Sequence, residues 1–145
     1  MLPSSIVSWD DFKASFPTGK VLSQDTGHSA PYGLNPYTGY DRDTSPFLFS
    51  GELDPRLAPM ERVLGVTVNG ESAAYPFSVL AEVGAVNDSV GGKAIAVFYA
   101  SGTVSPLDSR DISESREVGS AAMYDPTIEG KSLTFEWKDG AIVDR

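Results

Sequence analysis

The chain has 145 residues and a formal net charge of −9, with 20 acidic and 11 basic side chains and no cysteine. Its hydrophobic fraction of 41% is typical of a folded domain, and its negative charge disfavours nucleic acid and anionic lipid as partners. The lack of cysteine excludes disulfides, thiolate nucleophiles and cysteine-ligated zinc, and the longest apolar run, Ala94–Ala100, is too short to span a membrane.

The first predicted element is a short helix in "SWDDFKASFP". Ser8 is a suitable N-cap, Asp11 follows three residues later as in a capping box, and Pro17 ends the helix. Three aromatic residues at helical spacing form an apolar stripe that we expect to belong to the core: Trp9, Phe12 and Phe16.

Residues 24–59 are rich in Gly, Pro, Asp, Asn and Tyr and have little periodicity, which predicts a long irregular arm. Asn35, Asp41 and Asp43 carry oxygen atoms that could bind calcium, but they lack the spacing of an EF-hand loop, so a plain loop is favoured. His28 is the single histidine, no nucleophile motif accompanies it, and we expect it on the surface.

The same arm contains Tyr32, Tyr37 and Tyr40. Tyrosine buries a large area at a low cost in side-chain entropy and is enriched at protein interfaces. We therefore expect these tyrosines to contact a partner, either a second half-domain or another copy of the chain.

From residue 61 onward the pattern predicts antiparallel hairpins. In "RVLGVTVNGESAAY" the Asn69-Gly70 pair is typical of a type I′ turn. Closing that turn pairs Val66 with Ala73 and Leu64 with Tyr75, which gives one face that is apolar throughout.

Two further hairpins follow a short predicted helix in "FSVLAEV". The return strand of "AVNDSVGGKAIAVFY" is apolar at nearly every position and should be central, and "KSLTFEWKDGAIV" should turn at Asp139-Gly140. Between them lies a polar segment, predicted as a solvated helix or loop because its acids would spread around a helix: Asp108, Asp111, Glu114 and Glu117.

Three stretches resemble, in order, the later part of the prokaryotic domain-of-unknown-function family thirty-one seventy-nine. They begin at "VSWDDFKASFPTGK", "ERVLGVTVNGESAAYP" and "ESREVGSAAMYDP", and the spacing from Tyr75-Pro76 to "VNDSVGG" is the most specific part. The resemblance implies a longer, often exported protein of two related halves. This chain is similar to the end of one half and most of the next, which would make it a fragment or a truncated gene product. A Cys-Pro-Leu-Cys stretch found in many relatives reads "YASGTVSPLD" here, so no thiol chemistry carries over.

The candidate site residues centre on Asn87 and Asp88. Asn and Asp followed by Gly91-Gly92 are typical of a hairpin loop, which is the favoured interpretation. The alternative is a binding loop, with further residues taken from the resemblance and from the carboxylates of the chain: Tyr75, Arg116, Ser120 and Asp125.

These patterns predict a mainly β (α+β) fold, in which antiparallel hairpins form a small sheet or open barrel with one or two short helices. Residues 1–60 would form a helix and an irregular arm packing on the domain, and residues 61–145 the hairpin core, in one domain. "MLPSSIVSW" shows no export signal, although the resemblance implies an extracytoplasmic location.

Two functions remain open at this point. The first is a non-catalytic binding or structural module of an exported prokaryotic protein, without metal or cofactor. The second is a hydrolase acting on carbohydrate or ester, with Asp88 and Asp125 as the paired carboxylates.

Overall fold

The computed structural model describes residues 4–145, so the first three residues of "MLPSSIVSW" and of the predicted 1–60 arm lie outside it. The chain forms two compact units. The sheet unit is built chiefly from Glu61–Ser101 and Gly119–Arg145, and the loop unit from Ile6–Met60 and Gly102–Val118.

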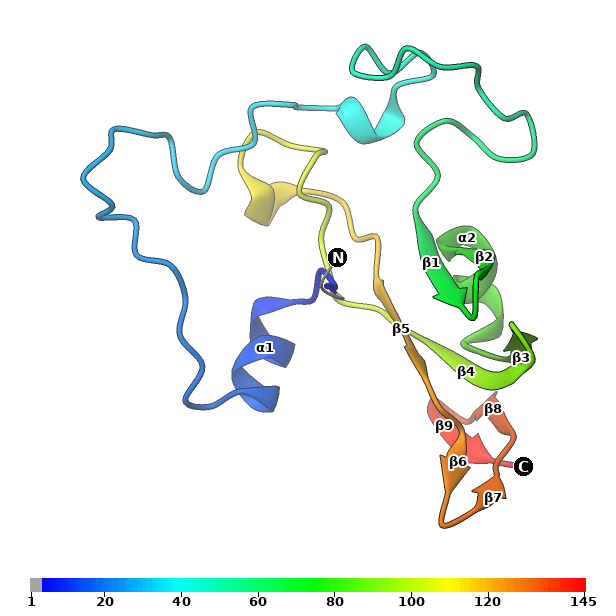
Figure 1. Cartoon of the computed structure of the whole chain (residues 1–145). Coiled ribbons are helices and arrows are strands. Elements are labelled where there is room, and N and C mark those ends of the chain that lie inside the picture. The colour runs from blue at the N-terminus through cyan, green and yellow to red at the C-terminus, as the bar shows by residue number, and fades with distance from the viewer. Residues whose placement is uncertain (1–3) are drawn as a thin grey trace. The chain divides into compact units, whose positions relative to one another are not determined.

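The sheet unit consists of antiparallel hairpins and one short helix, which confirms the mainly β class (Figure 1). Among the described residues the strands form small separate sheets that do not close into a barrel. The elements are β1 (Val63–Val68), β2 (Glu71–Pro76), α2 (Phe77–Val83), β3 (Ala85–Val90), β4 (Lys93–Ala100), β5 (Ser120–Tyr124), β6 (Thr127–Ile128), β7 (Lys131–Ser132), β8 (Phe135–Lys138) and β9 (Ala141–Asp144).

Tight two-residue turns set the register of these hairpins. Asn69 and Gly70, which join β1 to β2, both have positive φ, as a type I′ turn requires. The predicted pairs are confirmed, since Val66 lies opposite Ala73 and Leu64 opposite Tyr75. The predicted turn between β8 and β9 is confirmed as well, with positive φ at Asp139 and Gly140.

Strand β4 is the centre of the sheet unit. It lies between β3 and β5, and its residues Ile95, Ala96 and Val97 are at most 3% exposed, which confirms a central strand covered on both faces. The core around it draws one or two residues from each neighbouring element: Val66, Tyr75, Leu80, Val90, Ile95, Val97 and Ala121.

The loop unit has little regular structure. It contains α1 (Trp9–Ser15) and two short 3₁₀ helices, η1 (Tyr40–Arg42) and η2 (Ile112–Glu114). An isolated bridge between Leu34 and Asp111 joins its two segments, and a second, between Val104 and Glu117, lies within the later segment. The order of this unit must therefore come from side-chain contacts more than from backbone ladders.

Helix α1 starts as the sequence predicts but does not bury its apolar stripe. The Ser8 side chain accepts a hydrogen bond from the Asp11 N–H, as expected of an N-cap. Trp9 and Phe16 are 57% and 61% exposed, however, so the prediction that the stripe is core is wrong. The three rings contact one another along the helix instead: Trp9 stacks on Phe12 with centroids 5.5 Å apart, and Phe12 is tilted against Phe16 at 5.6 Å.

The polar segment before β5 is largely a loop with exposed acids at Asp111, Glu114 and Glu117, as predicted, but part of it is not solvated. Asp108, Ser105 and Ser115 are buried, and each makes hydrogen bonds inside the loop unit. Spacing along a helix could not reveal this, because only three residues of the segment, η2, are helical.

The turn between β3 and β4 offers a matched pair of substitutions. Gly91 and Gly92 both have positive φ, but a Cβ at Gly91 would lie 2.1 Å from the Val68 carbonyl oxygen, whereas a Cβ at Gly92 meets nothing within 4 Å. Gly92→Ala should cost only the conformational strain of about 1–2 kcal/mol. Gly91→Ala should cost at least about 1 kcal/mol more, because the β1–β2 hairpin must move. Urea unfolding of both variants measures the difference, and equal losses would contradict it.

Candidate binding site

Asn87 lies in the middle of β3 and not in a turn, so its interpretation as a hairpin-loop residue is wrong; the loop is Gly91-Gly92 alone. Its side-chain amide donates to the Phe135 carbonyl oxygen at 2.7 Å, and its Oδ1 accepts from the Phe135 N–H at 2.8 Å. The side chain thus pairs with the backbone of β8 as a neighbouring strand would. This contact ties the β8–β9 hairpin to β3.

Asp88, the next residue, points to Tyr75. The Tyr75 hydroxyl donates to Asp88 Oδ2 at 2.8 Å, and Asp88 Oδ1 accepts the Ser89 N–H at 2.7 Å. Burial, followed by the hydrogen bond to Asp88, raises the pKa of Tyr75 to about 12. Tyr75 is therefore a neutral hydrogen-bond donor near neutral pH.

Ser120 is the first residue of β5, and Asp125 directly follows the strand. Ser120 is the Cα partner of Ala100 on β4. Asp125 accepts the Thr127 N–H at 2.8 Å, and hydrogen bonds with Thr127 hold the pKa of its carboxyl below its usual value. Because β4 separates β3 from β5, and strands are about 4.8 Å apart, Asp88 and Asp125 are two strand spacings apart.

Arg116 belongs to the loop unit, where it binds Asp41. Its Nη2 lies 2.9 Å from Asp41 Oδ2, and the same oxygen accepts the Ser105 hydroxyl at 2.6 Å. Asp41 Oδ1 is buried without a hydrogen-bond partner among the described residues. Such a group costs about 1–3 kcal/mol, so the contacts of Oδ2 are needed to keep Asp41 inside.

A second ion pair joins the same two segments of the loop unit. Arg42, next to Asp41, binds buried Asp108 through Nη2, and Asp108 Oδ2 also accepts the Arg116 N–H at 2.8 Å. That backbone hydrogen bond, with the charge of Arg42, lowers the pKa of Asp108. We call these contacts the crossed ion pairs: Asp41 with Arg116, and Arg42 with Asp108. They fasten η1 to the segment before β5.

Asn35 adds a neutral contact between the same two segments. It is buried, its amide donates to the Ser109 carbonyl oxygen at 3.1 Å, and its Oδ1 accepts the Tyr37 N–H at 2.7 Å. The three oxygen-bearing side chains considered for calcium thus have protein partners, including Asp43, which accepts the Ser45 N–H. Among the described residues no group of three acidic or histidine side chains could hold a metal ion.

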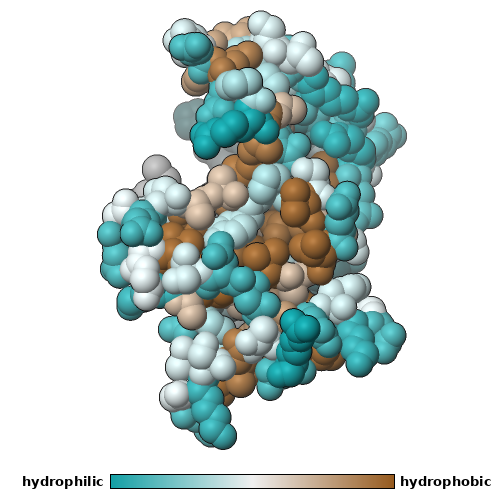
Figure 2. All heavy atoms as spheres, turned by 90° about the vertical axis from the view of Figure 1, so that its right-hand side faces the viewer, coloured by the Kyte–Doolittle hydropathy of each residue, from teal (hydrophilic) through white to brown (hydrophobic). Residues whose placement is uncertain are grey.

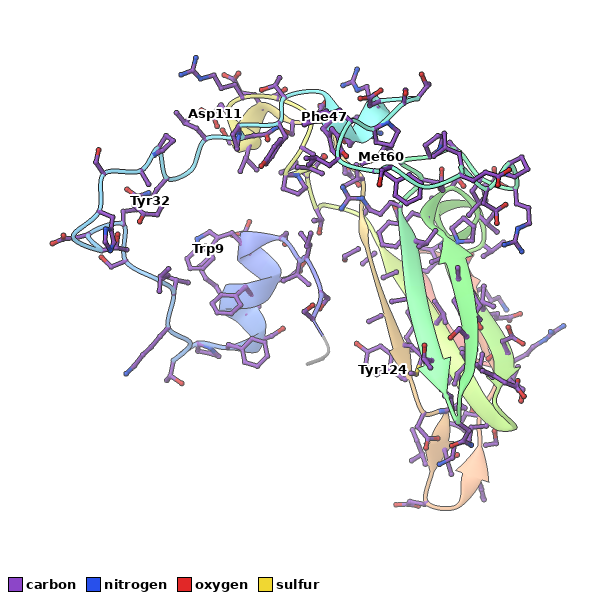
Figure 3. All side chains as sticks on the ribbon, turned by 45° about the horizontal axis from the view of Figure 1, so that its top comes forward. Trp9, Tyr32, Phe47, Met60, Asp111 and Tyr124 are labelled. Carbon is purple, nitrogen blue, oxygen red and sulfur yellow. The ribbon has the colours of Figure 1, made fainter. Side chains whose placement is uncertain are left out.

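The crossed ion pairs position an exposed pocket on η1, which we call the aromatic pocket. Its volume is about 310 Å³. It is lined by the aromatic side chains Tyr37, Tyr40 and Phe47 and by the polar side chains Thr38, Arg42 and Asp43. The rings pack closely, with centroid distances from 5.1 Å (Tyr40 to Phe47) to 6.5 Å (Tyr37 to Phe47), and Phe47 lies beside η1 (Figure 3).

A second cavity of about 300 Å³ adjoins the aromatic pocket, because Pro36 and Thr38 line both. Its other lining residues include Leu34 and Arg110. The loop unit therefore offers two neighbouring cavities along residues 31–47.

Sequence reasoning found part of this site. It singled out Tyr37 and Tyr40 as contact residues and Arg116 as a site residue, but it missed Phe47, Arg42 and Asp108. The adjacent opposite charges of Asp41 and Arg42 were a usable signal in the sequence. A buried charge needs a partner of opposite sign, and such a pair of neighbours therefore indicates two ion pairs with residues elsewhere in the chain.

Hydrophobic side chains also reach the surface outside these cavities (Figure 2). The described part of the chain contains no helix with the length and apolar character that crossing a membrane requires.

Comparison with protein families gives one match over nearly the whole chain. The family described as a protein of unknown function (DUF3179) matches residues 1–143, in agreement with the resemblance seen in the sequence. Comparisons with curated proteins and with solved structures give no match. A function must therefore be argued from the geometry of the molecule.

Asn87→Ala should destabilise the sheet unit by about 1–3 kcal/mol, because it removes two hydrogen bonds to the Phe135 backbone, each worth about 0.5–1.5 kcal/mol. Ser89→Ala is the matched control, since Ser89 is an exposed residue of the same strand and should stay within about 0.5 kcal/mol of the wild type. Urea unfolding gives both values. If Asn87→Ala is as stable as the control, Asn87 does not hold β8.

Stability should depend on Tyr75 at alkaline pH. Its folded-state pKa of about 12 lies above the usual 10.0, so its contribution is complete below pH 10 and is lost as the pH rises toward 12. Asp88→Asn should lower the pKa of Tyr75 only in part, because burial is the larger cause. Phenolate absorbance is followed during alkaline titration of the wild type and of Tyr75→Phe, and the difference between the two curves gives the titration of Tyr75. A Tyr75 pKa at the usual 10.0 would contradict the prediction.

The crossed ion pairs should fail in acid. The pKa of Asp108 is lowered from its usual 3.8, so its contribution is complete above that pH and is lost as the pH falls through the folded-state value. Asp108→Asn should be less stable at neutral pH and should lose part of this acid dependence. The NMR signal of the Arg116 amide, followed during acid titration, reports the protonation of Asp108, because this amide donates to the Asp108 carboxylate. An unchanged acid midpoint in Asp108→Asn would contradict the assignment.

Proposed function

Since the chain belongs to the DUF3179 family of proteins of unknown function, we propose a role from its own surface: it is a non-catalytic binding module that holds a neutral carbohydrate in the aromatic pocket. The observation that carries the proposal is the combination of exposed aromatic rings with one basic and one acidic side chain in the same cavity. Export from a prokaryotic cell, which the resemblance implies, stays a prediction.

The aromatic rings supply a surface for an apolar face. Phe47 is 69% exposed and Tyr37 is 44% exposed, so both rings can contact a ligand without rearrangement. The C–H face of a sugar ring can stack on such rings, which gain contact area at little cost in entropy.

The polar groups select against a charged ligand. Arg42 repels cations and Asp43 repels anions, whereas a sugar hydroxyl can accept from the first and donate to the second. The Arg42 side chain is 62% exposed although it pairs with Asp108, and within residues 4–145 Asp43 uses only one oxygen, for the Ser45 N–H. Both groups therefore keep hydrogen-bonding capacity for a ligand.

The hydrolase alternative has no such support. Glycoside hydrolysis needs two carboxyls that flank the bond to be cleaved and therefore line one cavity. Of the three cavities described for residues 4–145, one is lined by Asp43, one by Glu82 and one by no carboxylate. Asp88 and Asp125 line none of them. Binding without catalysis is the function that we propose.

Titration with soluble hexasaccharides of glucose, xylose and N-acetylglucosamine, followed by NMR, tests the proposal. We expect at least one of them to shift the amides of residues 36–47. Phe47→Ala should weaken that binding at least about fivefold, because it removes a stacking surface worth roughly 1 kcal/mol or more. Phe49→Ala is the matched control, because Phe49 is also exposed, lies two residues away and does not line the pocket.

Two results would overturn the proposal. One is the absence of shifts at residues 36–47 with all three sugars at millimolar concentration. The other is equal loss of binding in Phe47→Ala and Phe49→Ala, which would place the ligand elsewhere. The contact of Tyr32, Tyr37 and Tyr40 with a second half-domain or with another copy of the chain is a separate proposal and stays a prediction.

A further inference from the structure

The sheet unit contains a cavity of its own, which we call the Trp137 pocket. Its volume is about 180 Å³, and it lies between the end of α2, the end of β4 and strand β8. The side chains that line it are Trp137, Tyr99, Glu82, Ser101, Ala81 and Ala100. It is below the usual size of a site for drug-sized ligands, so it suits a single small group.

Glycine holds both aromatic rings of this pocket in place. Gly84, with φ +69°, follows α2, and a Cβ there would lie 2.8 Å from Cβ and Cγ of Trp137. A Cβ at Gly119, with φ +70°, would lie 2.1 Å from the Tyr99 hydroxyl oxygen. Each ring therefore rests directly on backbone, which fixes it before any ligand arrives. Trp137 is still 50% exposed.

The charge in the pocket has one sign. Among the described residues that line it, only Glu82 is charged, and Glu82 has no ion pair or hydrogen bond from its side chain within the described chain. An aromatic face is negative and attracts cations, most strongly for Trp. The net charge of −9 adds a long-range attraction for cations.

We propose that the Trp137 pocket binds a small organic cation, an alkylated ammonium group whose charge lies over the indole and near the Glu82 carboxylate. This pocket differs from the aromatic pocket, where Arg42 would oppose such a ligand. The proposal does not depend on carbohydrate binding, because the two pockets share no residue.

The chain already contains one contact of this kind. Lys13 Nζ lies 5.6 Å from the centroid of the Trp9 ring, within the range of a cation–π interaction. Trp9 is 57% exposed, similar to Trp137, but its face carries a cation of the protein itself. The two tryptophans of the chain thus form an internal comparison between an occupied and a free indole.

Choline and 3,3-dimethyl-1-butanol are matched probes, because they have nearly the same shape and differ in the positive charge. In ¹H–¹⁵N NMR spectra of the whole chain, with the two indole N–H signals assigned from Trp9→Phe, choline should shift the Trp137 signal with a dissociation constant in the millimolar range. The Trp9 signal should stay in place. The neutral alcohol should bind at least about fivefold more weakly, as expected when the cation contributes most of the attraction.

Glu82→Gln tests the carboxylate. It should weaken choline binding about threefold, the effect of losing one exposed charge pair. Glu52→Gln is the control, because it removes the same charge from an exposed residue of the loop unit and should leave binding unchanged. Indole signals that match those of the wild type would show that each variant is folded.

Three results would overturn the proposal. Equal binding of choline and the alcohol would identify an apolar cavity without selectivity for charge. Equal shifts of the Trp9 and Trp137 indole signals would show that choline contacts any exposed indole and does not prefer this pocket. Unchanged affinity in Glu82→Gln would remove the carboxylate from the site.

Discussion

The crossed ion pairs are the constraint on which the loop unit depends. Asp41 and Arg42 are neighbours of opposite charge, and each reaches a partner more than sixty residues away in sequence, Arg116 and Asp108. Ordering a residue costs about 1–2 kcal/mol in backbone entropy, and this unit has few ladders to offset that cost. Buried charge stabilises a fold only when hydrogen bonds accompany it, as they do at Asp108 and Asp41.

The aromatic pocket follows from this arrangement. Asp41 points inward from η1, while Tyr40 and Arg42 on either side of it line the pocket. A substitution at Asp41 should therefore move the side chains that line the pocket, although Asp41 itself does not line it. Arg116 acts in the same way as a positioning residue, through Asp41.

The sheet unit reaches order by different means. Its hairpins close through turns of two residues with positive φ, and β4 places apolar side chains on both faces. Asn87 then replaces part of a strand ladder with its side chain, which lets the short β8–β9 hairpin dock on β3. The Trp137 pocket lies beside β8, so it depends on the hairpin that Asn87 holds.

Local patterns predicted the sheet unit well, because turn chemistry and alternation act over a few residues. Asn69-Gly70, Asp139-Gly140 and the apolar run of β4 each specify their own surroundings. The loop unit was harder, because its contacts join residues that no periodicity relates. Asp108 looked solvated for that reason, and Asn87 looked like a turn residue because its true partner, Phe135, is 48 residues away.

Hydrogen exchange of individual amides tests most directly whether the crossed ion pairs order the loop unit. The Gly39 N–H binds the Asp108 carbonyl oxygen, and the Arg116 N–H binds the Asp108 carboxylate, whereas the Thr26 N–H belongs to a local turn. The account predicts that the Gly39 and Arg116 amides exchange together and at least about 100-fold more slowly than the Thr26 amide. Exchange of all three at similar, unprotected rates would show that the crossed ion pairs do not hold the loop unit.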